Sequence, residues 1–306
     1  MRKRRLWADL ALTLVAFIWG VAFVVQRVAA AEVQAFVFNG IRFLLGAIVI
    51  LPFTLARALP ELRSGSRVTG KYRLGVLLAG LLLVCGSAFQ QVGLKYTTAS
   101  NAGFITGLYV VVIPILLMFG GRRKQPRPLV WVAALLSALG LFLLSTGGQI
   151  QVNRGDILVM VSAFFWAFHV ILTDWLVRRV EVMQFAVGQY LVCGLVSLGL
   201  GLYLEPGALK AAASNWGLLA FMGIVSVGLG YTLQAVGQRV APPADTAIIL
   251  SLEAVFAALG GWLILGESLA PLQLLGCGII LAGMLLAQSE VILGKRLAVY
   301  HAEQHV

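Results

Sequence analysis

The chain has 306 residues, of which 60% are hydrophobic and only 11% are charged, and its formal net charge is +11. Soluble domains carry roughly 25% charged residues, so this composition excludes an ordinary soluble protein and predicts one that is built within a lipid bilayer. The excess of Lys and Arg does not indicate nucleic-acid binding, because the basic residues lie in short clusters between apolar segments and not on one solvated face.

Apolar segments of about the roughly 20 residues that a helix needs to cross a bilayer recur along the whole chain. The first follows a basic cluster, as a signal peptide does, but its apolar run exceeds the roughly 7 to 15 residues of a signal core, and we expect it to be retained. The sequence therefore predicts an all-α polytopic membrane protein of ten transmembrane helices. The expected spans are 8–28, 34–56, 72–94, 97–119, 128–146, 155–176, 182–204, 215–238, 243–265 and 271–291.

Lys and Arg are distributed unevenly between the two sides of these spans. Eighteen lie on the side that holds both ends of the chain, four lie on the other side, and Arg42 lies within a span. Because loops rich in Lys and Arg stay in the cytoplasm, we expect a multi-pass protein of the inner (plasma) membrane with cytoplasmic N- and C-termini. The polar tail, 293–306, is then expected on the cytoplasmic surface.

The two halves of the chain repeat each other. Residues 89–95 align with 233–239 at an offset of 144, and Trp19 aligns with Trp166 at an offset of 147. We therefore expect a first repeat of five helices at 1–148 and a second at 149–292. Since five is odd, the second repeat crosses the membrane in the opposite sense, and such inverted repeats enclose a substrate site near the midplane. The sequence thus predicts a central cavity between two inverted repeats.

Short motifs also stand in a characteristic order along the chain. They are Phe17-Ile18-Trp19-Gly20, Arg42-Phe43, the segment 99–109 running on to Pro114, Gly155-Asp156, Leu252-Glu253 and Gly266-Glu267-Ser268-Leu269. Together they resemble the EamA-like family of the drug/metabolite transporter superfamily, over nearly the whole chain. The resemblance implies ten helices in two inverted repeats around a cavity, and export or exchange of amino acids, other metabolites or drugs. The family's second half often carries Glu-Pro where this chain has Glu253-Ala254, which leaves a kink there open.

Two ionisable side chains fall at membrane depth, where each costs roughly 2.5 to 3.5 kcal/mol and requires a partner, water or a function. Arg42 is a candidate for attracting an anion or forming a gate, and the alternative is that it pairs with helix-end carbonyls or with Glu253 and only stabilises the fold. Glu253 is a candidate for binding a substrate ammonium group or for carrying a proton coupled to transport. Its alternative is a neutral acid hydrogen-bonded within the bundle.

Aromatic and uncharged polar side chains complete the candidate set for substrate binding or gating. Trp19, Trp166 and His169 fall near the middle of two repeat-related helices, away from the interfaces where Trp usually gathers. They are expected in the cavity wall, with plain core packing as the alternative. The remaining candidates either orient a substrate or join helices to one another, and they are Gln90, Asn101, Tyr109, Gln189, Tyr231 and Gln234.

A stripe of small residues marks the fourth span. Ala99, Gly103 and Gly107 are one helical turn apart, and small residues recur at the matching positions of the ninth span. Because such stripes allow helices to approach closely, we expect the fourth and ninth helices to pack on one another.

These observations favour a secondary transporter that exports or exchanges a small metabolite, such as an amino acid or a drug-like solute, by alternating access. A membrane scaffold or receptor-like protein without transport is the alternative, and an intramembrane enzyme is the least favoured reading, because Glu253 is the only acid at mid-span. We expect no cofactor and no metal site, and no nucleic-acid partner. The expected partners are the substrate and the bilayer, with the chain acting as a monomer or homodimer. No ATP-binding motif occurs, so any pumping draws on gradients.

Overall fold

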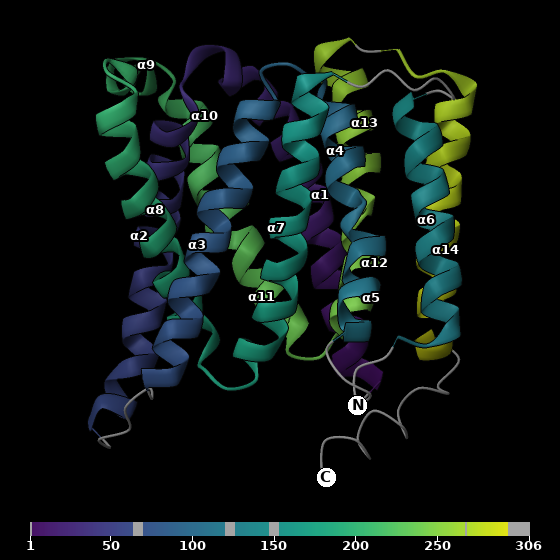
Figure 1. Ribbon diagram of the computed structural model, residues 1–306. Coiled ribbons are helices and arrows are strands. Elements are labelled where there is room, and N and C mark those ends of the chain that lie inside the picture. Colours follow the sequence, from purple (N-terminus) through teal and green to yellow (C-terminus); the bar gives the residue numbers. More distant parts are fainter. Residues whose placement is uncertain (1, 64–69, 120–125, 147–152, 267, 293–306) are drawn as a thin grey trace.

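The computed structural model describes residues 2–63, 70–119, 126–146, 153–266 and 268–292. Every regular element in these ranges is a helix, and the helices stand side by side in one bundle (Figure 1). Among the described residues, nine helical segments are long and apolar enough to cross a membrane, and a tenth, Pro128–Leu144, is apolar but shorter. The predicted all-α fold of ten transmembrane helices is confirmed. The predicted tail, 293–306, lies outside the described residues.

The first five crossings form the first half of the bundle, and the fourth of them is made of two helices, α4 and α5. A short turn at residues 33–34 joins the first two crossings. The elements are α1 (Arg2–Glu32), α2 (Ala35–Arg63), α3 (Gly70–Gly93), α4 (Ala99–Gly107), α5 (Tyr109–Phe119) and α6 (Pro128–Thr146).

The second five crossings follow the same plan, with two differences in the eighth. This crossing is preceded by a short helix, α9, and its middle part, η2, is a π-helix, a rare form that often marks functional sites. The elements are α7 (Arg154–Val177), α8 (Val182–Leu204), α9 (Ala208–Ser214), α10 (Trp216–Ala220), η2 (Phe221–Tyr231), α11 (Thr232–Gln238), α12 (Pro243–Leu250), α13 (Leu252–Leu265) and α14 (Pro271–Ile292).

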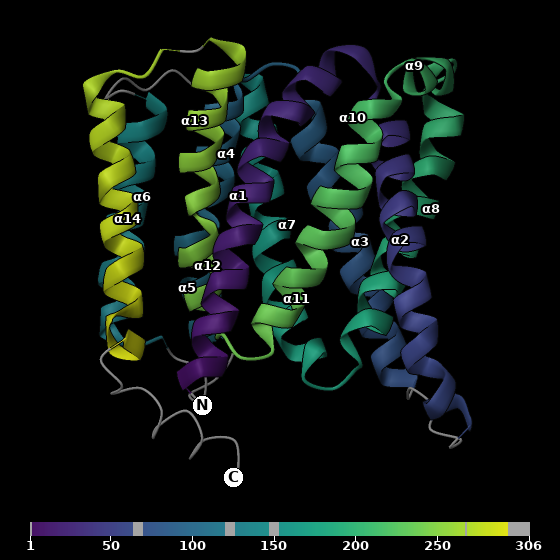
Figure 2. The ribbon, with the colours of Figure 1, turned by 180° about the vertical axis from the view of Figure 1, so that it is seen from behind.

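Helix packing follows the inverted repeat. Figures 1 and 2 show α2 beside α8 at one edge of the bundle and α6 beside α14 at the other, and each pair joins equivalent helices of the two halves. Helix α1 of the first repeat packs on α13 of the second, and the equivalent helix α7 packs on α4. In the same way α3 packs on α7, and the equivalent crossing, η2 and α11, packs on α1. Since α1 and α7 begin at opposite faces of the bundle (Figure 1), the two five-helix repeats are inverted.

The fourth and ninth crossings are each interrupted at mid-length. The break falls at Leu108 between α4 and α5 and at Ser251 between α12 and α13. The first break is followed by Pro114, whose missing N–H and bulky ring weaken a helix. The second half has no proline here, yet its helix is interrupted, and the Ala254 N–H donates to Ser251 O (3.2 Å) at the three-residue spacing of a tight turn. The sequence Glu253-Ala254 left open whether this helix is kinked. The structure shows that the helix is interrupted just before these residues, at Ser251.

The predicted contact between the fourth and ninth crossings is confirmed for one residue of the small-residue stripe and wrong for another. A Cβ on Gly103 would lie 3.3 Å from Ala254 of α13, so α4 and α13 approach closely there. A Cβ on Gly107 would instead meet Leu141 of α6 at 3.0 Å. Because the helix turns by 100° at each residue, a stripe at four-residue spacing drifts around the axis, and its far end reaches a different neighbour.

Candidate functional site

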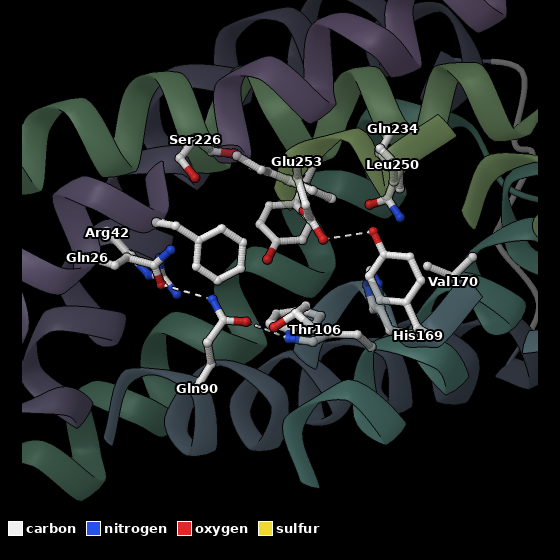
Figure 3. Close-up of a pocket in the computed structure, with 15 residues that line it drawn as sticks. Gln26, Arg42, Gln90, Thr106, His169, Val170, Ser226, Gln234, Leu250 and Glu253 are labelled. Atoms are coloured by element: carbon white, nitrogen blue, oxygen red, sulfur yellow. Dashed lines mark hydrogen bonds between the residues drawn. The ribbon is translucent and has the colours of Figure 1, made fainter. Parts of the chain in front are cut away.

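A cavity of about 40 Å³, enough for a few water molecules, lies between the two repeats near the middle of their spans (Figure 3). Helices of both repeats and the two broken crossings meet around it. Its lining residues are Trp19, Phe23, Gln26, Arg42, Gln90, Thr106, Tyr109, Trp166, His169, Val170, Ser226, Tyr231, Gln234, Leu250 and Glu253. The predicted central cavity is present.

Most of the lining residues come in equivalent pairs from the two repeats. At the offset of 147 found for the first helix of each repeat, or of 144 found farther along, ten of the fifteen lining residues fall into five pairs. The cavity therefore lies on the pseudo-two-fold axis between the two repeats. The pairs are Trp19 with Trp166, Phe23 with Val170, Gln90 with Gln234, Thr106 with Leu250, and Tyr109 with Glu253.

Glu253 enters the cavity from the beginning of α13, just after the break at Ser251. Its side chain is buried, and the Tyr109 hydroxyl donates a hydrogen bond of 2.9 Å to Glu253 Oε1. Figure 3 shows this bond across the cavity. An acid held by one neutral donor at membrane depth is able to receive a cationic group.

Arg42 is buried on α2, with 2% of its surface exposed, and it lines the cavity at the end opposite His169 in the view of Figure 3. Its guanidinium carbon lies 5.2 Å from the ring centres of both Phe38 and Phe43, within the range of a cation–π interaction. Among the described residues it forms no ion pair, with Glu253 or any other acid, and its Nε has no hydrogen-bond partner. In the part of the chain that the structure describes, this buried positive charge therefore has two aromatic faces beside it and no acidic partner.

Tyr231, at the end of η2, is the centre of an aromatic cluster. Its ring lies 4.6 Å from Trp19, 6.1 Å from Trp166 and 6.1 Å from His169, measured between ring centres. Trp19 is held in turn by its indole N–H, which donates to Ser226 O of the π-helix at 3.2 Å. The cluster gives the cavity an aromatic wall of the kind that holds apolar or cationic parts of a solute.

A chain of amide hydrogen bonds runs along the cavity wall. The Trp166 indole N–H donates to Gln90 Oε1 at 2.8 Å, and Gln90 Nε2 donates to Gln26 Oε1 at 3.2 Å. The neighbouring Gln91 Nε2 donates to the Gln26 backbone carbonyl at 3.1 Å. Three helices, α1, α3 and α7, are therefore joined by hydrogen bonds beside the cavity.

Nine of the eleven candidate residues predicted from the sequence line this cavity. Asn101 and Gln189 do not. Gln189 instead lies behind His169, with its Oε1 2.8 Å from His169 Nε2, and Asn101 lies at the start of α4, where its backbone N–H donates to Thr98 Oγ1. The lining residues missed by the sequence reasoning are Phe23, Gln26, Thr106, Val170, Ser226 and Leu250. Gln26, an amide in an apolar span like Gln90, carried the same signal.

Two polar clusters lie away from the cavity, one at each face of the bundle. At the face where α1 begins, Arg5 pairs with Asp9 (2.8 Å) and with Asp245 of α12 (3.0 Å). At the opposite face, the Thr97 hydroxyl donates to Asp156 Oδ1 of α7 at 2.6 Å. No group of three His, Cys, Asp or Glu side chains that would suit a metal ion occurs in the part of the chain that the structure describes.

The fold and this cavity define a polytopic membrane protein of two inverted five-helix repeats, with a polar and aromatic site on the axis between them. The sequence profile of the EamA-like transporter family matches the chain twice, over residues 6–146 and 153–288. The chain belongs to the EamA-like transporter family, and the resemblance seen in its motifs is confirmed.

Individual relatives agree with this assignment. An uncharacterized transporter of Archaeoglobus fulgidus is 31% identical over 94% of this chain and 88% of its own length. The inner membrane transporter YedA of Escherichia coli is 28% identical over 92% and 89%, and the threonine/homoserine exporter RhtA of the same species is 28% identical over 68% and 67%. A crystal structure with 19% identity superposes with a TM-score of 0.75, covering 95% of this chain and 98% of its own, which shows the shared fold.

Proposed function

We propose that the protein is a secondary transporter that exports or exchanges a small zwitterionic metabolite, such as an amino acid, across the inner membrane by alternating access. The observation that carries the proposal is the presence of a basic and an acidic side chain in one buried cavity on the pseudo-two-fold axis: Arg42, which has no ion-pair partner among the described residues, and Glu253, held by Tyr109. The name of the relative RhtA, a threonine/homoserine exporter, supports the same class of substrate.

The two charges assign a role to each end of the substrate. The carboxylate of the solute binds near Arg42, where it neutralises a buried guanidinium that otherwise keeps its desolvation cost. The ammonium group binds near Glu253, and Trp19, Trp166 and Tyr231 pack against the side chain. A solute that lacks either charge leaves one protein charge buried and unpaired, so a zwitterion is favoured over a neutral analogue.

Alternating access requires that one face of the bundle opens while the other stays closed. The Arg5 ion pairs with Asp9 and Asp245 join α1 to α12 at the face where α1 begins, and the hydrogen bond between Thr97 and Asp156 lies at the opposite face. Asp9 and Asp156 are equivalent positions of the repeats, at the offset of 147. We propose that these two clusters are the gates, and that the Arg5 cluster is the cytoplasmic one, as the distribution of Lys and Arg in the sequence predicts.

Counterflow in proteoliposomes tests this function. Vesicles loaded with an unlabelled solute are diluted into the same labelled solute, and a panel of amino acids, nucleosides and cationic dyes is compared. We expect uptake of one or a few zwitterions by the wild type, loss of uptake in Arg42→Gln and Glu253→Gln, and unchanged uptake in Ser162→Ala. Ser162 is the control because it is buried and, among the described residues, its hydroxyl bonds only to Val159 O of its own helix. A folded wild type that moves none of these solutes, at either direction of a pH gradient, favours the scaffold alternative.

A further inference from the structure

We propose that Gln26 and Arg42 together form a binding site for a monovalent carboxylate, and that Trp166 and Gln90 are positioning residues that turn the Gln26 amide N–H groups toward it. The inference rests on the proposed function, because the carboxylate is that of the transported zwitterion. It adds to that function a second ligand residue, Gln26, and a reason for the orientation of its amide.

Gln26 and Arg42 lie at the same depth in the bundle. They flank the turn between α1 and α2, and each is eight residues from Gln34, which places both roughly 12 Å below the turn along antiparallel helices. Both side chains line the cavity, and Figure 3 shows them at the same end of it. A ligand group at this end therefore meets both side chains.

The direction of the amide chain follows from chemistry. An indole N–H only donates, so Trp166 fixes the Gln90 side chain with its oxygen toward the indole. Gln90 then presents its nitrogen to Gln26 Oε1. With its oxygen engaged, Gln26 has its nitrogen left for the cavity, and Gln26 Nε2 forms no hydrogen bond with any residue in the described ranges. Gln26 is 4% exposed and Gln90 5%, so water does not compete freely for either amide.

Both groups that this site offers to a ligand are hydrogen-bond donors. The Arg42 guanidinium contributes the charge and Gln26 Nε2 a neutral N–H donor, while the acceptor oxygens of both glutamines are occupied. Donors around one positive charge, without an acceptor, select an anion. A single positive charge balances a monoanion and leaves a dianion such as sulfate undercompensated. A carboxylate, which accepts from two or more donors, fits better than a spherical halide.

Binding of small anions to the purified full-length protein tests the site without transport. The protein in detergent, in a sulfate buffer free of chloride and carboxylates, is titrated with acetate, chloride, threonine or threoninamide. Sulfate holds the ionic strength constant between samples. The readouts are the melting temperature and the intrinsic tryptophan fluorescence, to which Trp19 and Trp166 of the cavity contribute among the seven tryptophans of the chain. We expect saturable effects of acetate and threonine, which compete with each other, and none of threoninamide, which lacks the carboxylate.

Variants separate the ligand residues from the positioning residues. Arg42→Gln is expected to abolish acetate and threonine binding, Gln26→Met to weaken it about tenfold, and Gln90→Met about three- to tenfold, since each removes or misdirects a donor to a charged group. Gln273→Met is the matched control, because Gln273 Nε2 makes an interhelical bond to Leu144 O (2.8 Å) far from the cavity. We expect the unliganded Gln90→Met and Gln273→Met proteins to show similar changes in melting temperature. Only Gln90→Met is expected to lose affinity for acetate and threonine.

Three outcomes overturn the inference. They are equal acetate affinity in Gln26→Met and wild type, equal affinity for threonine and threoninamide, and saturation by chloride alone. If the protein transports a zwitterion and yet binds anions independently of Gln26, the inference fails and the proposed function stands. If the anion pattern appears as expected but no solute crosses the vesicle membrane, the function fails and the site stands.

Discussion

Tyr109 and Glu253 occupy equivalent positions of the two repeats, 144 residues apart, and their side chains are hydrogen-bonded to each other at 2.9 Å. Each follows the break in its own crossing, so the bond joins two interrupted helices at the point where they meet on the axis. The duplicated halves have thus diverged at one matched position into a donor and an acceptor. The equivalent positions Arg42 and Gln189 have also diverged, and of these two residues only Arg42 lines the cavity.

This bond predicts different results for two conservative substitutions of the pair. Glu253→Gln keeps an acceptor for the Tyr109 hydroxyl and removes the charge, so we expect a normal melting temperature and loss of zwitterion uptake. Tyr109→Phe keeps the charge but removes its donor, so we expect a higher KM with a smaller change in Vmax, because the carboxylate is less well oriented. Initial rates in proteoliposomes measure both. A lowered melting temperature of Tyr109→Phe with an unchanged KM would mean that the bond serves stability alone.

Replacement of Arg42 by glutamine, the residue at the equivalent position of the second repeat, should separate function from stability. A buried arginine at membrane depth costs roughly 2.5 to 3.5 kcal/mol on insertion scales, and the Arg42 guanidinium has no acidic partner among the described residues. We expect Arg42→Gln to melt at the same or a higher temperature than the wild type and to lose uptake. A strong fall in melting temperature would instead assign Arg42 to the fold.

The sequence predicted how deep in the bilayer the site lies better than it predicted which face of each helix points to the site. Apolar run lengths placed the ten crossings, and a charge or amide within a run marked its depth, which is why Arg42, Gln90 and Glu253 were found. The face that a helical residue presents depends on its neighbours, because each residue turns the helix by 100°. For this reason Gln189 was expected at the cavity and instead lies behind His169. The orientation of the Gln26 amide depends on a bond from α3, which no local pattern encodes.

The gate proposed at the face where α1 begins should weaken when its ion pair is removed. Asp245→Asn takes the charge partner from Arg5, which lies 3.0 Å away, and leaves Arg5 paired with Asp9 in its own helix. We expect the cavity to become more accessible from that face. The probe is Leu250→Cys, a lining position, in a background where Cys85, Cys193 and Cys277 are replaced by Ala. An impermeant maleimide should label it several-fold faster in inside-out vesicles when Asp245→Asn is present. Unchanged labelling, or faster labelling from the other side of the membrane, contradicts the gate assignment.

Glu205 supplies a prediction that concerns stability alone. Its carboxylate accepts hydrogen bonds from the backbone N–H groups of Phe36 (3.0 Å) and Val37 (2.8 Å), in the first turn of α2. These donors have no partner within the helix, and an acid at a helix N-terminus also interacts favourably with the helix dipole. Loss of such a cap costs about 0.5 to 2 kcal/mol. We therefore expect Glu205→Ala to lower the melting temperature in detergent and Glu205→Gln, which keeps one acceptor, to lower it less. The KM for the transported solute should stay unchanged in both variants, because Glu205 does not line the cavity; a raised KM in Glu205→Gln would mean that the position of α2 also determines how Arg42 is presented.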